Sequence, residues 1–177
     1  MDEMAKEIIS LQQKYATLAI ENWLSGAVLT WNWWVLVFMF IFPWLIFLKY
    51  LDRERSLQIW CFGLIVILIT SFTDDLGSEL SVWIYPIKFA PFGLLALPFD
   101  FSMIPVAYML IYQYFKSWKT FCIALVSQAT IFAFVGEPFS VWLGFVTYLK
   151  WEYIYSFVFY IVTGLAARFF IQKLTPY

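Results

Sequence analysis

The sequence predicts an all-α integral membrane protein, in which five transmembrane helices form a bundle and an amphipathic helix precedes them. Of its residues, 63% are hydrophobic and only 13% are charged, a balance that is unlike that of soluble domains. Five stretches carry no charged residue, and they cover residues 22–48, 56–73, 101–115, 120–136 and 153–167. Each comes close to the roughly 20 residues that an α-helix needs to cross a bilayer.

Residues 1–25 predict the separate amphipathic helix, on the outer side of the membrane. Apolar side chains recur there at alternating steps of four and three residues, at Met4, Ile8, Leu11, Tyr15 and Leu18. This spacing places them in one stripe along a helix. The stripe favours a helix that lies in the membrane interface or packs on its own bundle. A short coiled coil with another chain is the alternative.

Residues 26–177 are predicted to form the membrane domain, with spans at about 29–49, 56–75, 97–115, 119–137 and 152–171. Tryptophan is enriched at the membrane interface, and four tryptophans lie where the chain enters the first span: Trp23, Trp31, Trp33 and Trp34. The connection 77–97 is interrupted by prolines. We expect it to be an interfacial or re-entrant segment.

The basic residues predict the orientation of the chain. Five spans put the two ends on opposite sides, and the basic residues then divide unequally between the sides. One side receives Lys49, Arg53, Arg55, Lys116, Lys119, Arg168 and Lys173, and the other receives Lys6, Lys14, Lys88 and Lys150. Cytoplasmic loops carry an excess of lysine and arginine, so the N-terminus is predicted outside and the C-terminus in the cytoplasm.

The sequence lacks the residues that several kinds of chemistry require. The chain has no histidine, which removes the commonest general base and most zinc sites. Three acids occur in D-D-L-G-S-E (Asp74, Asp75 and Glu79), but a metal-diphosphate site needs more basic residues than the outer side offers. The sequence contains no motif of a phosphate-binding loop and no basic patch of the kind that binds nucleic acids. We therefore expect no metal, no cofactor and no nucleic-acid partner, with membrane lipids as the surroundings.

Three carboxylates are the best candidates for a site. Asp74 ends the second predicted span, Asp100 begins the third and Glu137 ends the fourth. Because successive spans run in opposite directions, all three arrive at a similar depth near the outer surface. Asp100 and Glu137 lie in apolar sequence, where an ionisable residue usually faces a protein interior or a wet cavity. Helix capping is the alternative explanation for Asp100.

Aromatic side chains are expected at the same level, at Trp83, Tyr85, Trp142 and Trp151. An aromatic belt at the membrane surface explains residues of this kind. Aromatic faces beside carboxylates also suit an organic cation or a flat amphipathic ligand. The predicted ligand-binding set therefore joins these four residues with Asp74, Asp100 and Glu137.

Longer motifs carry a resemblance to a known family. They are W-N-W-W and F-P-W in the first span, D-x-x-G and then W-x-Y-P after the second, P-F-D-F-S-M-I-P-V-A-Y-M-L-I-Y-Q-Y-F in the third, G-E-P-F-S-V-W-L-G after the fourth, and W-E-Y-I-Y-S-F in the last. From about residue 23 onward the chain resembles small polytopic membrane proteins of spore-forming Gram-positive bacteria, catalogued under a clostridial locus tag and without an assigned activity.

The resemblance implies a bacterial cytoplasmic membrane but no particular reaction. The family pattern picks out Asp74, Gly77, Trp83, Tyr85, Pro86, Asp100, Pro105, Glu137 and Pro138. Asp75 and Glu79 depart from it, which counts against a family-wide metal motif.

Three functions are compatible with these residues. The first is a membrane protein that binds, senses or translocates a small cationic or amphipathic ligand through an acidic, aromatic pocket open to the outer leaflet. The second is a membrane-embedded enzyme for a lipid or isoprenoid, in which Asp100 or Glu137 protonates the substrate as a terpene cyclase does. The third is a structural subunit of a homo-oligomer or membrane complex, with the N-terminal stripe as its contact.

Overall fold

A computed structural model describes residues 2–93 and 95–174. In chain order its helical elements are α1 (Glu3–Asn22), the π-helical turn η1 (Trp23–Ala27), α2 (Trp31–Tyr50), α3 (Ser56–Glu79), η2 (Phe99–Met103), α4 (Ile104–Tyr114), α5 (Trp118–Ile131), η3 (Phe132–Gly136), α6 (Glu137–Trp142) and α7 (Tyr153–Leu174). The strands are β1 (Trp83–Ile84) and β2 (Thr147–Tyr148). The all-α prediction is confirmed, while the extreme ends of the two predicted regions, residue 1 and residues 175–177, lie outside the described residues.

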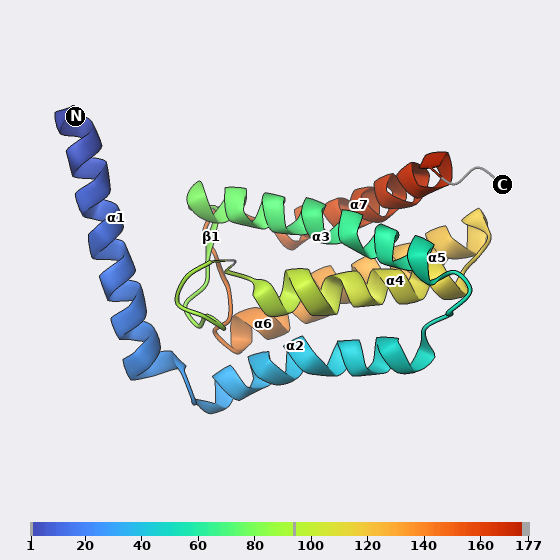
Figure 1. Cartoon of the computed structure of the whole chain (residues 1–177), viewed down its shortest axis with the longest axis horizontal. Helices are drawn as coiled ribbons and strands as arrows, with labels where there is room; N and C mark the ends of the chain where they lie inside the picture. The colour runs from blue at the N-terminus through green and yellow to red at the C-terminus, as the bar shows by residue number, and fades with distance from the viewer. Residues whose placement is uncertain (1, 94, 175–177) are drawn as a thin grey trace.

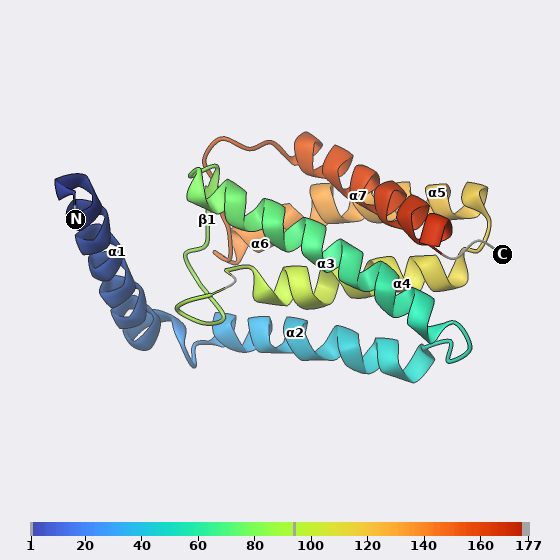
Figure 2. The same cartoon turned by 45° about the horizontal axis from the view of Figure 1, so that its top comes forward.

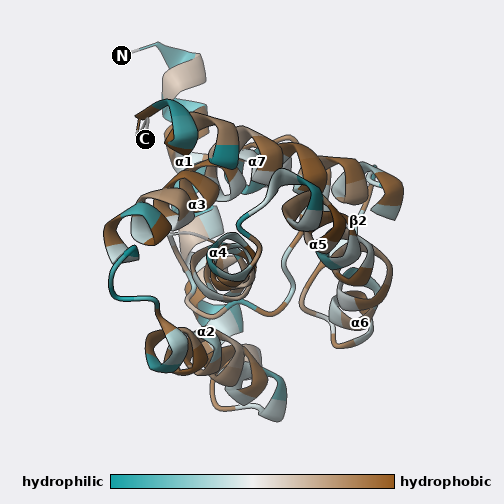
Figure 3. Ribbon diagram, turned by 90° about the vertical axis from the view of Figure 1, so that its right-hand side faces the viewer, coloured by the Kyte–Doolittle hydropathy of each residue, from teal (hydrophilic) through white to brown (hydrophobic). Residues whose placement is uncertain are grey.

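Among the residues that the structure describes, four helices are long and apolar enough to cross a membrane, which is the architecture of a multi-pass membrane protein. They are Trp31–Tyr50, Ser56–Glu79, Trp118–Trp142 and Tyr153–Leu174. The remaining predicted span, 97–115, is a shorter helix in which the five residues of η2 continue into the eleven of α4. Figure 3 shows α4 in the middle of the bundle, with the longer helices around it.

The central helix α4 holds the core together. Ile104, Val106, Tyr108 and Met109 are all at most 8% exposed, and they pack against side chains of α3, α5 and α7. The Tyr108 hydroxyl donates a hydrogen bond of 2.6 Å to the carbonyl of Tyr160 in α7. Such a bond joins two buried helices without leaving a polar group unpaired.

Two proline-associated π-helical turns shape the spans. In an α-helix a proline ring clashes with the carbonyl four residues earlier and lacks its own N–H. η2 precedes Pro105 and η3 precedes Pro138, and the wider π turn accommodates both defects. The fourth span therefore continues past Pro138 to Trp142, so the prediction that it ends at Glu137 was wrong.

One end of the bundle carries the two strands. β1 and β2 pair antiparallel, with Trp83 opposite Tyr148 and Ile84 opposite Thr147. The predicted segment 77–97 thus contains the end of α3, then β1, then irregular chain. The indole of Trp33 donates to the carbonyl of Phe89 (3.0 Å), which fastens this segment to α2.

The opposite end of the bundle collects basic residues. The α2–α3 turn, the α4–α5 turn and the end of α7 lie together there in Figure 1. These places hold Lys49, Arg53, Arg55, Lys116, Lys119 and Lys173. The guanidinium of Arg168 donates to the carbonyls of Phe115 (3.1 Å) and Lys116, which closes the α4–α5 turn.

Helix α1 lies crosswise to the bundle at the end with the strands (Figures 1 and 2). None of its described residues is buried. The apolar stripe is exposed, with Met4 at 68% and Leu11 at 59%. Tyr15 touches the rest of the chain, where Lys88 Nζ donates to its hydroxyl (2.8 Å).

We predict that Gly164→Ala weakens the core. A Cβ at this position would lie 2.5 Å from Cδ1 of Leu125 and 2.9 Å from Cε1 of Tyr108. Overpacking of this kind costs about 1–3 kcal/mol of unfolding free energy. Chemical unfolding in mild detergent measures it, with Gly26→Ala as the control, because the nearest atom to a Cβ there is 4.0 Å away. Equal stability of the two variants would contradict the close approach of α7 to its neighbours.

Candidate functional site

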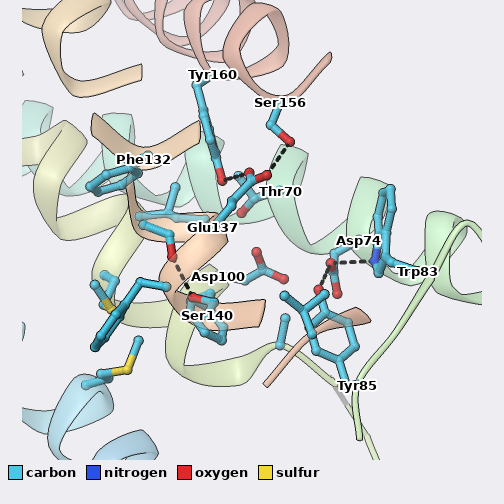
Figure 4. A pocket seen from close by; sticks show the side chains of 18 of the residues that line it. Thr70, Asp74, Trp83, Tyr85, Asp100, Phe132, Glu137, Ser140, Ser156 and Tyr160 are labelled. Atoms are coloured by element: carbon cyan, nitrogen blue, oxygen red, sulfur yellow. Dashed lines mark hydrogen bonds between the residues drawn. The ribbon is translucent and has the colours of Figure 1, made fainter. Parts of the chain in front are cut away.

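The end of the bundle that carries the strands contains a cavity of about 370 Å³. Its wall is formed by side chains from α2, α3, η2, η3, α6 and α7 and from the chain around β1 and β2. Asp74, Asp100 and Glu137 all reach this wall, each from a different segment of the bundle (Figure 4). We call this space the acidic cavity.

Asp74 accepts hydrogen bonds from two aromatic side chains. Its Oδ1 atom accepts from the indole N–H of Trp83 (3.1 Å) and from the hydroxyl of Tyr85. Burial raises the pKa of Tyr85 well above its ordinary value, and the charge of Asp74 raises it further. The phenol therefore keeps its proton and acts as a donor. The other carboxylate oxygen of Asp74, Oδ2, is buried with no partner in the described part of the chain.

Gly77 is needed for this arrangement. A Cβ on Gly77 would lie 2.1 Å from Cζ2 of Trp83, so any side chain there would displace the indole. Gly77 sits one turn after Asp74 on α3, and Trp83 folds back over it. Because Gly77 has no side chain, the indole of Trp83 can lie close to α3 and donate to Asp74.

Glu137 is only 8% exposed and is held by α7. Its Oε1 accepts from the hydroxyl of Tyr160 (2.9 Å) and its Oε2 accepts from the hydroxyl of Ser156 (2.9 Å). The indole of Trp151 in turn donates to the Ser156 oxygen (2.7 Å). Burial raises the pKa of the nearby Tyr148, and the Glu137 charge raises it further, so this phenol also stays protonated.

Asp100 is 5% exposed and is the least supported of the three carboxylates. The hydroxyl of Thr70 is its side-chain hydrogen-bond partner. The same hydroxyl also lies 3.3 Å from the carbonyl oxygen of Ile67. Pro98 is the N-cap of η2 and forms no side-chain cap hydrogen bond, while Asp100 lies in the first turn of η2, where a carboxylate complements the helix dipole. In Figure 4 it lies between Glu137 and Asp74, and the charge of Asp74 acts on it.

None of the three carboxylates has a basic partner. Within residues 2–93 and 95–174, the ion pairs are Lys6–Glu3 on α1 and Arg55–Asp52 at the opposite end of the bundle. Carboxylates inside an apolar bundle are costly when they are charged and unpaired. The acidic cavity is therefore complementary to positive charge.

Six of the seven predicted ligand-binding residues line the acidic cavity: Asp74, Asp100, Glu137, Trp83, Tyr85 and Trp151. Trp142 does not line it and is 76% exposed. A span that ended at Glu137 would have left Trp142 in a loop above the site. Because the helix continues through α6, Trp142 lies on its outer surface instead.

Sequence reasoning missed several polar residues of the wall, namely Thr70, Ser140, Ser156 and Tyr160. Ser156 and Tyr160 are four residues apart, so they share one face of α7. Two hydroxyls on one face of an apolar span were the available signal.

The other acids of D-D-L-G-S-E lie elsewhere. Asp75 and Glu79 border a second hollow, between the end of α3 and α1, where Tyr15 and Lys88 also lie. Across the described ranges, no three histidine, cysteine, aspartate or glutamate side chains come together as a metal site. The motif therefore contributes one acid, Asp74, to the acidic cavity and two acids to this hollow.

No family model, curated protein or solved structure matches this chain. The geometry of the cavity therefore carries the functional argument alone.

We predict that Tyr160→Phe destabilises the fold through Glu137. The change removes the hydroxyl that donates to Oε1 of Glu137, which lies 2.9 Å away in the wild type. A buried acceptor without a partner costs about 1–3 kcal/mol of unfolding free energy. Chemical unfolding compares it with Tyr155→Phe, an equal change on the exposed face of α7. In a double-mutant cycle with Glu137→Gln, the two effects should be clearly non-additive. Additive effects would show that the two side chains are not coupled.

Proposed function

We propose that the chain crosses a bacterial cytoplasmic membrane five times, with the N-terminus outside and the C-terminus in the cytoplasm. In addition to the four long helices, the third crossing in chain order is the continuous helix of η2 and α4, whose ends reach the same two ends of the bundle as its neighbours (Figure 1). The collection of basic residues at one end supports this orientation. The acidic cavity then belongs to the outer half of the membrane.

We propose that the acidic cavity binds a small organic cation, as the site of a binding, sensing or translocating membrane protein. The observation that carries this proposal is the convergence of three carboxylates on one aromatic-walled cavity without a basic residue. A cation of matching size offsets the cost of the buried charges. The indoles of Trp83 and Trp151 provide faces that attract ammonium groups.

The three carboxylates differ in what they can do for such a ligand. Glu137 and Asp74 are fixed in place by hydroxyl and indole donors. Among the described residues, Asp100 has a single side-chain donor, the hydroxyl of Thr70, and it lies between the other two (Figure 4). We infer that Asp100 is the direct counter-charge of the ligand and that its neighbours set the field around it.

An enzyme acting on a lipid or isoprenoid is the second candidate, and the same difference between the acids favours Asp100 as its proton donor. Glu137 accepts two hydrogen bonds, which stabilise its charged form and so disfavour the protonated form that a proton donor needs. Asp100 has the hydroxyl of Thr70 as its side-chain donor, one fewer than Glu137, and it faces an aromatic wall that could stabilise a carbocation. A product that accumulates with turnover and is absent in Asp100→Asn would favour this candidate.

The exposed stripe of α1 supports the third candidate, a contact within a homo-oligomer or larger complex. Removal of residues 2–20 should then lower the number of chains in the detergent-solubilised particle while the bundle stays folded. An unchanged number of chains per particle and an unchanged stability would favour a helix that lies in the membrane interface.

The cation proposal predicts the behaviour of Asp100→Asn. Tetramethylammonium should bind the wild-type protein in nanodiscs, and Asp100→Asn should weaken binding by about tenfold to a hundredfold, since a buried counter-charge is lost. Titration calorimetry measures the affinity. Glu79→Gln is the matched control, because Glu79 is exposed and borders the other hollow. Equal affinity of Asp100→Asn and Glu79→Gln, or no binding to any form, would overturn the proposal.

A further inference from the structure

Two of the side chains that line the acidic cavity are exposed on the side of the bundle. Of all the side chains that line it, Phe38 on α2 and Phe139 on α6 are the exposed ones, at 57% and 54%. The mouth therefore lies between α2 and α6. Polar lining residues such as Asp100 and Ser140 are buried behind it.

The end of the bundle above this mouth is closed. The amide of Asn32 at the start of α2 donates to the carbonyl of Leu143 beyond α6 (2.8 Å). Leu36, Leu143 and Phe145 pack together behind this bond and are almost fully buried. Phe38 comes after Asn32 on α2, and Phe139 comes before Leu143 on the opposed helix. Both therefore lie on the membrane side of this seal.

The surface around the mouth is one that lipid would cover. Its exposed side chains are apolar, including Trp34 (54%) and Val135 (63%). The sequence carries no charge from residue 22 to 48 or from residue 120 to 136. A hydrophilic solute would have to cross hydrocarbon to reach such an entrance, whereas an amphipathic molecule already resides there.

We propose that the ligand is an amphipathic organic cation that enters from the membrane through this portal. Its ammonium head lies at Asp100 and its apolar tail passes between Phe38 and Phe139 into the bilayer. This inference rests on the proposed cation site, and it adds the ligand class and the direction of entry. The two phenylalanines act as specificity-determining residues, because they contact the tail and not the charge.

The test uses the whole chain in lipid nanodiscs with three probes: tetramethylammonium and its homologues in which one methyl is replaced by octyl or dodecyl. Specific binding is the difference between wild-type protein and Asp100→Asn, which removes simple partitioning into lipid. We expect affinity to rise by about tenfold or more from the tetramethyl to the dodecyl probe, since each methylene that enters the portal is removed from water. Equal specific affinity for all three probes would overturn the portal while leaving the cation site intact. Absence of Asp100-dependent binding for every probe would instead overturn the site itself.

A labelling experiment locates the tail. The variants Phe38→Cys and Phe139→Cys are made in a chain that also carries Cys61→Ser and Cys122→Ser, and their thiols react with pyrenyl-maleimide. Dodecyltrimethylammonium should slow labelling at both positions about fivefold or more, as expected for an occupied portal. Leu45→Cys is the control, since Leu45 is 60% exposed on the same helix and does not line the cavity. Equal protection at all three positions, or none at 38 and 139, would contradict entry between α2 and α6.

Discussion

The rest of the structure depends on the burial of three carboxylates without a basic partner. An apolar bundle normally excludes such groups because charged oxygens lose their hydration there. This chain instead surrounds two of them with donors that carry no charge. Trp83 and Tyr85 hold Asp74, while Ser156 and Tyr160 hold Glu137. Donors of this kind fix the oxygens but do not neutralise a negative charge on them, and this is the basis of the proposed cation site.

The backbone features of the bundle follow from the same constraint. The π turns before Pro105 and Pro138 carry Asp100 and Glu137 into the interior in helices that would otherwise break. The β1–β2 pairing brings Trp83 next to Tyr148, so two chain segments from distant hairpins cover one cavity. The central position of α4 places Asp100 between the other acids (Figures 3 and 4). The result is a polar interior with an apolar side entrance, which matches a molecule that has a charged head and an apolar tail.

Part of this could be predicted from the sequence. Charge-free runs predicted the long spans, and the alternating direction of successive spans predicted that Asp74, Asp100 and Glu137 would meet. The predicted position of Trp142 was wrong because proline usually ends a helix, whereas the π turn of η3 lets this span continue past Pro138. The β1–β2 pairing and the hydroxyls of α7 were missed because both depend on contacts between distant segments. Hydropathy alone does not encode such contacts, nor does it show that Phe38 and Phe139 line the same cavity.

The most direct test of the central claim is mass spectrometry of the small molecules that copurify with the protein in a mild detergent. Wild-type protein is compared with the double variant Asp100→Asn, Glu137→Gln and with Glu79→Gln, all at matched thermal stability. The account predicts that the wild type and Glu79→Gln retain one amphipathic amine or quaternary ammonium compound and that the double variant loses it. If all three carry the same bulk lipids and nothing more, the acidic cavity is not a ligand site and the account is wrong.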